Sequence, residues 1–390
     1  MYEIELNSNF SNALLSNSKN YENTGIDVID KNIKYGNFFE NYLMKNLPCI
    51  IKNVSGHWEC SRRWRIDNEI DYDYLTNVYG DLEAPVADCS ELNSNTHCKV
   101  NMTVKNYMNY MKHKTDKLQY LKDWHLKRNR PNDNFYEIPI MFASDWLNEF
   151  SDDKTEDDYK FVYIGPKDSW TPLHADVYSS YSWSVNVVGR KKWTLFPPGE
   201  ENKLKDKFGN IPTKFVNELY TDVKYYEIIQ ETGDAIFVPS GWFHQVFNLL
   251  DTISINHNWI NGCNVEIVLD ALESNLINVQ NEIKEFSDTE NFEPHCQLML
   301  KSIFGMDYKV FVEFINHIGN KRLRELVSDS HKGLADCYLG IKHIKFDLYV
   351  ILKILIKLCN HPIINNEEII PLHLKHETHV LKQNLSLLSL

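Results

Sequence analysis

The segment from Lys160 to Trp259 constrains the fold most strongly, because it alternates short apolar runs with sharp turns. The runs are rich in Val, Ile, Phe, Tyr and Trp, and Gly-Pro, Pro-Pro-Gly, Thr-Gly-Asp and Pro-Ser-Gly separate them. Such runs between turn-forming residues are typical of antiparallel strands. A double-sheet jelly roll holds many short strands around one core and brings distant segments together. The segment therefore predicts a jelly-roll barrel.

Three side chains in this segment form a candidate metal site. His174 and Asp176 are two residues apart, so both side chains point to the same face of an extended strand. His244 follows on a later run, in Gly-Trp-Phe-His. Two imidazoles and one carboxylate are the ligand set of non-haem Fe(II) oxygenases, and this set leaves coordination positions of the iron open. A structural zinc site is instead closed by a fourth protein ligand. We predict that these residues are catalytic and bind Fe(II), although an H-x-D tripeptide alone would not distinguish a metal ligand from a packed histidine.

The strings around these residues carry more information than the tripeptide. His174 and Asp176 end FVYIGPKDSWTPLHAD, which is followed by SWSVNVVGRKKWTLFPPGEE and then by GDAIFVPSGWFHQVFNLLDTISINHNW. In this order they resemble the jumonji-C family of Fe(II)- and 2-oxoglutarate-dependent oxygenases, over roughly residues 30 to 262. Within that family, YLKDWH, SYSWSVNVVGRKKW and DTISINHNW are most similar to the jumonji domain-containing protein 4 group. The resemblance implies a lysyl hydroxylase of the eukaryotic translation release factor.

The same resemblance implies a co-substrate site. Lys191, in GRKKW, matches the family lysine that pairs with the distal carboxylate of 2-oxoglutarate, a dianion that an ammonium binds through strong charge-assisted hydrogen bonds. Thr171 matches a hydroxyl donor to that carboxylate, and Tyr120 matches an upstream strand tyrosine. Asn256 matches the polar residue that the family carries on a late strand, near 2-oxoglutarate and the metal. Ser184 matches a position of the same site at which some relatives carry Asn. For Tyr120, Asn256 or Ser184 taken alone, a structural hydrogen bond is the alternative.

His257, in SINHNW, is the alternative third metal ligand. Successive side chains of a strand point to opposite faces, so His257 should point away from Asn256. We therefore prefer His244.

The segments outside the barrel differ in pattern. We expect a polar lead-in at residues 1–28, helical and strand elements that pack on the barrel at 29–150, the core at 151–262, and a helical region at 263–390. The fold class is thus mainly β with helical additions, around a double-stranded β-helix of the cupin-like kind. FDLYVILKILIKLCN is apolar nearly all round, which predicts a buried helix or part of a homodimer interface.

Composition limits the partners. The net charge of -13 is unsuited to a broad phosphate-binding surface and fits a protein substrate better, although it also simply favours solubility. The eight cysteines form no C-x-x-C pair, and no apolar run is long enough to span a bilayer. We expect a cytoplasmic protein, with the nucleus as an alternative, that binds neither nucleic acid nor membranes directly.

The resemblance implies that Fe(II), 2-oxoglutarate and O₂ are used in hydroxylation, with succinate and CO₂ released and ascorbate supporting turnover. Hydroxylation and N-methyl-lysine demethylation, for example of histones, share one metal centre, so the metal ligands leave both open. A noncatalytic scaffold of the same fold and a metal-dependent isomerase of the cupin type would share the barrel as well. The presence of Lys191 in G-x-K-x-W favours the oxygenase over the scaffold and the isomerase.

Overall fold

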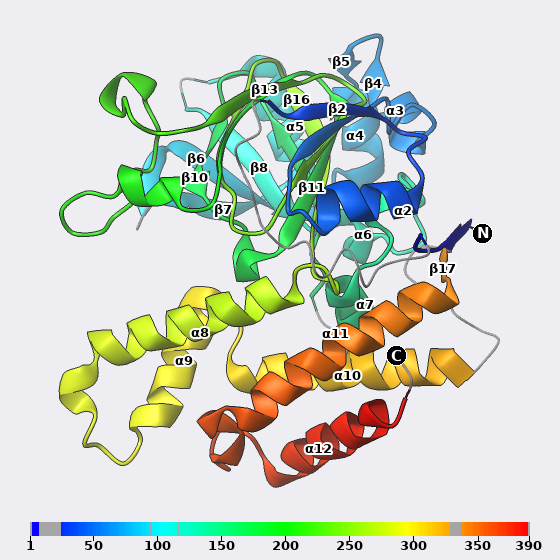
Figure 1. Ribbon diagram of the computed structural model, residues 1–390. Coiled ribbons are helices and arrows are strands. Elements are labelled where there is room, and N and C mark those ends of the chain that lie inside the picture. The colour runs from blue at the N-terminus through cyan, green and yellow to red at the C-terminus, as the bar shows by residue number, and fades with distance from the viewer. Residues whose placement is uncertain are drawn as a thin grey trace.

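The computed structural model describes residues 2–7, 25–93, 96–115, 117–155, 157–327 and 337–388. Two β-sheets form the upper part of the molecule in Figure 1, and a group of long helices lies below them. This arrangement confirms the predicted jelly-roll core with helical additions.

The two sheets have different sizes. The smaller sheet has the order β10 (Trp170–His174), β15 (Phe243–Asn248), β12 (Lys191–Phe196) and β13 (Tyr226–Gln230). The larger sheet has the order β2 (Asp27–Asp30), β3 (Cys49–Lys52), β14 (Ala235–Val238), β11 (Tyr181–Val188), β16 (Thr252–Trp259), β9 (Lys160–Gly165), β8 (Gln119–Trp124), β6 (Glu83–Asn93) and β7 (Thr96–Thr103). Among the described strands of these two sheets, only β2 and β3 pair in parallel, as expected for antiparallel runs joined by turns.

The N-terminal strands join the larger sheet itself. β2 and β3 continue one edge of the sheet, and β8, β6 and β7 continue the other. An unpaired sheet edge exposes backbone N–H and C=O groups, and the added strands satisfy them. The expected boundary at residue 28 falls inside β2, and the boundary at 150 falls inside the helix α7 (Trp146–Lys154).

Short helices connect the N-terminal strands. They are α2 (Tyr35–Phe38), α3 (Glu59–Arg63), α4 (Tyr72–Tyr79), α5 (Val104–His113) and α6 (Leu126–Asn129), and a short hairpin joins β4 (Arg65–Ile66) to β5 (Glu69–Ile70). The segment of residues 140–150 forms a 3₁₀ turn at Ile140–Phe142 and then α7. The helix begins after Asp145 because the Asp145 side chain accepts a hydrogen bond from the Asn148 backbone N–H and so caps α7.

The C-terminal region is helical, as the sequence predicts. Its helices are α8 (Val265–Glu282), α9 (Phe292–Phe304), α10 (Tyr308–Val327), α11 (Ile341–Asn360) and α12 (Leu372–Ser386). The apolar α11 packs against α10 and α12, which accounts for its burial within the subunit. The homodimer expected through these helices stays a prediction. Among the described residues, no helix is both long and apolar enough to cross a membrane.

The start of the chain is joined to the C-terminal region. β1 (Tyr2–Ile4) pairs in parallel with β17 (Cys337–Leu339), and Ile4 is fully buried. The Glu5 carboxylate accepts hydrogen bonds from the backbone N–H groups of Lys342 and His343, in the first turn of α11. A carboxylate at this position satisfies free N–H groups and complements the helix dipole. Residues 8–24 of the expected lead-in lie outside the described part.

Candidate metal centre

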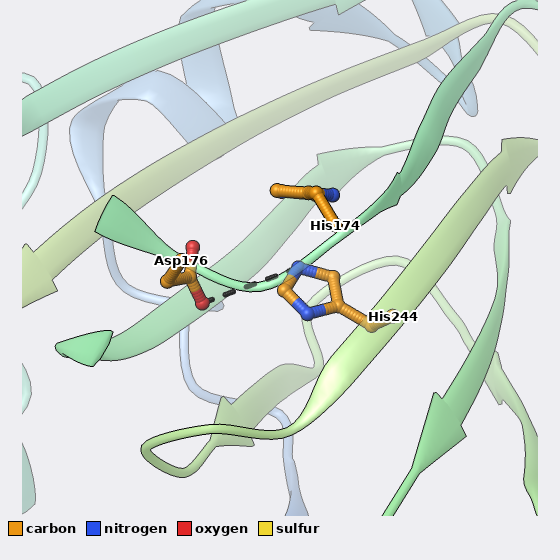
Figure 2. A group of neighbouring side chains, drawn as sticks. All are labelled: His174, Asp176 and His244. Carbon is orange, nitrogen blue, oxygen red and sulfur yellow. Dashed lines mark ion pairs between the residues drawn. The ribbon is translucent and has the colours of Figure 1, made fainter. Parts of the chain in front are cut away.

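The three predicted metal ligands lie together at one end of the smaller sheet. His174 ends β10 and faces His244 on β15, because these two residues are register partners, and their ring centroids are 4.3 Å apart. Asp176 lies just beyond β10 in extended backbone, and its Oδ2 is 4.0 Å from Nε2 of His244 (Figure 2). The potential ligand atoms of all three residues lie within 4.8 Å of one another. The structure thus brings together the residues that the sequence singled out.

Both imidazoles are held in the tautomer that a metal requires. His174 Nδ1 lies 2.8 Å from the Pro172 carbonyl oxygen, and His244 Nδ1 lies 3.1 Å from that of Trp242. A carbonyl oxygen can only accept a hydrogen bond, so each Nδ1 carries a proton, and Nε2 is the nitrogen of each ring that faces the site. Burial, followed by the neighbouring His244, lowers the pKa of His174 to about 4, which keeps its ring neutral at pH 7. This donor set fits a divalent transition metal.

The Asp176 carboxylate is held by two residues that the sequence analysis did not single out. Ser182 Oγ on β11 donates to Oδ2 at 2.6 Å, and Asn258 Nδ2 on β16 donates to Oδ1 at 2.9 Å. Such donors orient a ligating carboxylate before the metal arrives. The spacing in the sequence could have indicated one of them, because Asn258 is two residues beyond Asn256 and therefore lies on the same face of β16.

A β-bulge in β10 places Thr171 and His174 on one face. They are three positions apart, and in a regular strand an odd spacing would turn the side chains to opposite faces. The pairing with β15 shifts by one residue between Thr171↔Val246 and His174↔His244. One inserted residue restores the common face, so both side chains line the same cavity.

The predicted co-substrate residues gather deeper in this cavity. Lys191 Nζ donates to Tyr120 Oη at 3.2 Å and to Ser254 Oγ at 2.8 Å, and the lysine is 2% exposed. Ser254 was not predicted. Burial, followed by the charge of Lys122, lowers the pKa of Lys191 to about 7. The neighbouring Lys192 is directed outward instead and pairs with an acidic residue of β13.

The remaining predicted residues also line the cavity. Thr171 is half-buried there, and Ser184 is buried with its Oγ unpaired among the described residues. Asn256 donates a hydrogen bond to Ser254, whereas the hydrogen bond to Asp176 comes from Asn258. His257 is engaged elsewhere, since its Nε2 lies 2.7 Å from Tyr136 Oη. Its ring stacks on Trp183.

The cavity has a volume of about 430 Å³, within the range of small-molecule pockets. Its wall includes His97, Lys99, Lys122 and Asp123, all from the segment 85–135. None of residues 200–225 lines this cavity. Leu204 and Phe215 of this segment pack instead on the face of the smaller sheet that points away from the cavity.

Comparison with known proteins agrees with this geometry. The cupin-like domain family matches residues 36–264. The 2-oxoglutarate and iron-dependent oxygenase JMJD4 of Danio rerio is 44% identical over 357 residues, which cover 84% of this chain and 85% of that protein. The JMJD4 homolog of Drosophila melanogaster is 42% identical over 372 residues, 85% of this chain and 87% of that protein. The arginine-specific demethylase JMJ20 of Arabidopsis thaliana is 35% identical over 370 residues, 87% of this chain and 80% of that protein. These likenesses confirm the family resemblance of the sequence.

Proposed function

Because the chain belongs to the cupin-like oxygenases that depend on iron and 2-oxoglutarate, we propose that it hydroxylates a lysine side chain of the eukaryotic translation release factor. The oxygenase class follows from the family, and the choice of substrate is our proposal. The observation that carries the proposal is that His174, Asp176, His244 and Lys191 line one cavity.

His174, Asp176 and His244 would hold Fe(II), since their lone pairs converge and both rings have the required tautomer. When bound, Fe(II) and 2-oxoglutarate supply the oxidising chemistry, in which O₂ is consumed, a C–H bond becomes C–OH, and succinate and CO₂ are released. Three protein ligands leave positions open for the co-substrate and O₂.

The chain's own residues would bind and orient the co-substrate and exclude water from the site. Lys191 presents an ammonium to the co-substrate, and Tyr120 and Thr171 add hydroxyl groups on the same cavity wall. Trp193 and Val246 form an apolar part of that wall between the lysine and the metal ligands. An apolar wall strengthens charge-assisted hydrogen bonds beside it and helps to protect the oxidant from side reactions.

The choice of a lysine on a protein rests on two kinds of support. The cavity of about 430 Å³ suits the co-substrate and one extended side chain. The strings YLKDWH, SYSWSVNVVGRKKW and DTISINHNW carry the likeness to the release-factor hydroxylases. A release factor acts in the cytoplasm, so the proposal implies that this protein works there, with ascorbate maintaining Fe(II).

N-demethylation is a second candidate, and one observation favours it. The Arabidopsis thaliana relative is named an arginine-specific demethylase. Both reactions use the same metal ligands and differ only in which C–H bond is presented. A methylated histone peptide therefore belongs in the test.

Mass spectrometry of recombinant release factor tests the proposal. The factor is incubated with this protein, Fe(II), ascorbate and 2-oxoglutarate, beside a methylated histone peptide. We expect one added oxygen atom on a release-factor lysine, absent with His174→Ala and retained with His376→Ala, which changes an exposed histidine of α12. Loss of a methyl group from the peptide alone would establish the demethylase. Equal turnover by His174→Ala would exclude the metal assignment.

A further inference from the structure

A second lysine of the cavity was not singled out by the sequence. Lys122 lies on β8 two residues beyond Tyr120, so both side chains point to the cavity face. The pairing of β8 with β9 shifts by one residue between Leu121↔Ile164 and Trp124↔Val162. Asp123 occupies the bulge with a φ of 56°. The bulge therefore turns Trp124 into the core on the other side of the sheet.

The ammonium of Lys122 lies in the cavity wall and forms no hydrogen bond or ion pair among the described residues, although the charge of the adjacent Asp123 raises its pKa against the effect of burial. The residue is 8% exposed, and its Nζ is 5.6 Å from the ring centroids of both Tyr120 and Tyr163. Within the described part of the chain, no hydrogen bond or ion pair reaches this Nζ. The adjacent Asp123 is already engaged, because it accepts hydrogen bonds from Tyr163 and Lys99. A buried charge without a partner destabilises the folded state. Such a charge is typical of a binding site, where the ligand supplies the partner.

Lys122 and Lys191, together called the lysine pair, share one part of the cavity. Lys191 Nζ is 6.0 Å from the ring centroids of the same Tyr120 and Tyr163. Lys191 donates to neutral hydroxyl groups, so neither lysine is neutralised by a carboxylate among the described residues. The charge of Lys122 also helps to lower the pKa of Lys191, because the two ammonium groups are close enough to repel each other. A small anion between them would remove this repulsion.

We propose that the lysine pair binds dianionic 2-oxoglutarate, with Lys122 contributing a second ammonium beside that of Lys191. The inference rests on the proposed use of this cavity for 2-oxoglutarate, and it adds a binding residue to that site. A carboxylate of the polypeptide substrate has the same chemistry, so the test measures 2-oxoglutarate alone, without any polypeptide.

Calorimetric titration of 2-oxoglutarate into the Mn(II)-loaded full-length protein provides the first test. Lys122→Met should raise the Kd by about 10-fold or more, as expected when a charged hydrogen bond is lost. Lys192→Met removes an equal charge that points away from the cavity, and should leave the Kd unchanged. An unchanged Kd in Lys122→Met would overturn the inference while the wild-type binding still supported the oxygenase site. Absence of binding by the wild type would instead refute the co-substrate site itself.

Thermal melting without ligand provides the second test, because it separates a binding role from a structural one. Lys122→Met replaces an unpaired buried charge by an apolar side chain of similar length, so its Tm should equal or exceed that of the wild type. The rise in Tm that 2-oxoglutarate and Mn(II) produce should be smaller in the variant, because stabilisation follows affinity. A ligand-free Tm well below the wild-type value would show that Lys122 supports the fold and would overturn the assignment.

Discussion

Single residues around Asp176 determine how well the site is prepared for a metal. Asn258 and Ser182 each donate to one oxygen of its carboxylate, which leaves the remaining lone pairs directed toward the two histidines. Asn258→Ala removes one of these donors without touching a ligand atom. We expect about 10- to 100-fold weaker Mn(II) binding, which is typical when a hydrogen bond to a metal ligand is lost. Asn256→Ala, which changes a neighbour bonded to Ser254, should weaken Mn(II) binding less, and equal losses in the two variants would contradict this reasoning.

The protonation of Lys191 predicts a pH dependence for the co-substrate. Burial and the charge of Lys122 lower its pKa to about 7, and only the ammonium form attracts a dianion. As the pH rises from 6.5 to 8.5, the charged fraction falls and the Kd for 2-oxoglutarate should rise by about 25-fold. Calorimetry at several pH values measures this, with Lys191→Ala as the variant that binds weakly throughout. A Kd that stayed constant over this range would show that Lys191 keeps its proton.

The sequence predicts the strands of the barrel but not the irregularities within them. The strands of residues 160–259 were predictable because their apolar runs and turns are local signals. The bulges in β8 and β10 were not, since nothing in a run shows where one residue is left unpaired. They nevertheless decide that Thr171 and His174 both line the cavity and that Trp124 turns into the core. The likeness of the surrounding strings predicted Thr171 and His174, whereas Lys122 could have been found from its spacing to Tyr120.

The end of α9 supports the loop that carries Asp176. Gly305 ends this helix with a φ of +89°, and a Cβ there would lie 2.8 Å from the ring of Tyr178, which itself has a φ of 59°. Gly305→Ala should cost more than the roughly 1–2 kcal/mol of left-handed backbone strain, because it also displaces Tyr178. Gly209→Ala provides the matched control, with a φ of +86° and open space around its Cβ.

Urea unfolding and Mn(II) titration distinguish the two glycine variants. Gly209→Ala should lose stability alone, whereas Gly305→Ala should lose both stability and Mn(II) affinity. If both variants bound Mn(II) like the wild type, the contact between α9 and the metal loop would be irrelevant to the site.

At the scale of the whole molecule, a buried group of charges joins the C-terminal helices to the barrel. Arg322 of α10 is 0% exposed and donates to Glu149 of α7, Asp347 of α11 and Glu325. Trp146 also donates to Asp347. The sequence predicted these helices from their periodicity. It could not predict how they dock, because Arg322 lies 173 residues beyond Glu149, Asp347 lies 201 residues beyond Trp146, and no local pattern links them.

Removing the arginine tests how far this docking stabilises the fold. Arg322→Met removes the guanidinium from a buried group of three carboxylates and should lower the free energy of unfolding by about 3–5 kcal/mol, although Lys321 still pairs with Glu149 and Trp146 still donates to Asp347. Arg324→Met, an exposed change on the same helix, should stay within about 0.5 kcal/mol of the wild type. Urea denaturation measures both. A small effect of Arg322→Met would indicate that apolar packing alone holds the helices.

The pairing of β1 with β17 has a consequence for how the protein is made. The Glu5 carboxylate emerges from the ribosome early, yet the backbone of His343 that it caps is synthesised 338 residues later. The first residues must therefore remain unpaired while the barrel strands are translated and begin to associate. Tyr2–Ile4 can join α11 only after that helix has been synthesised, so protease protection of Tyr2–Ile4 would report when the two segments come together.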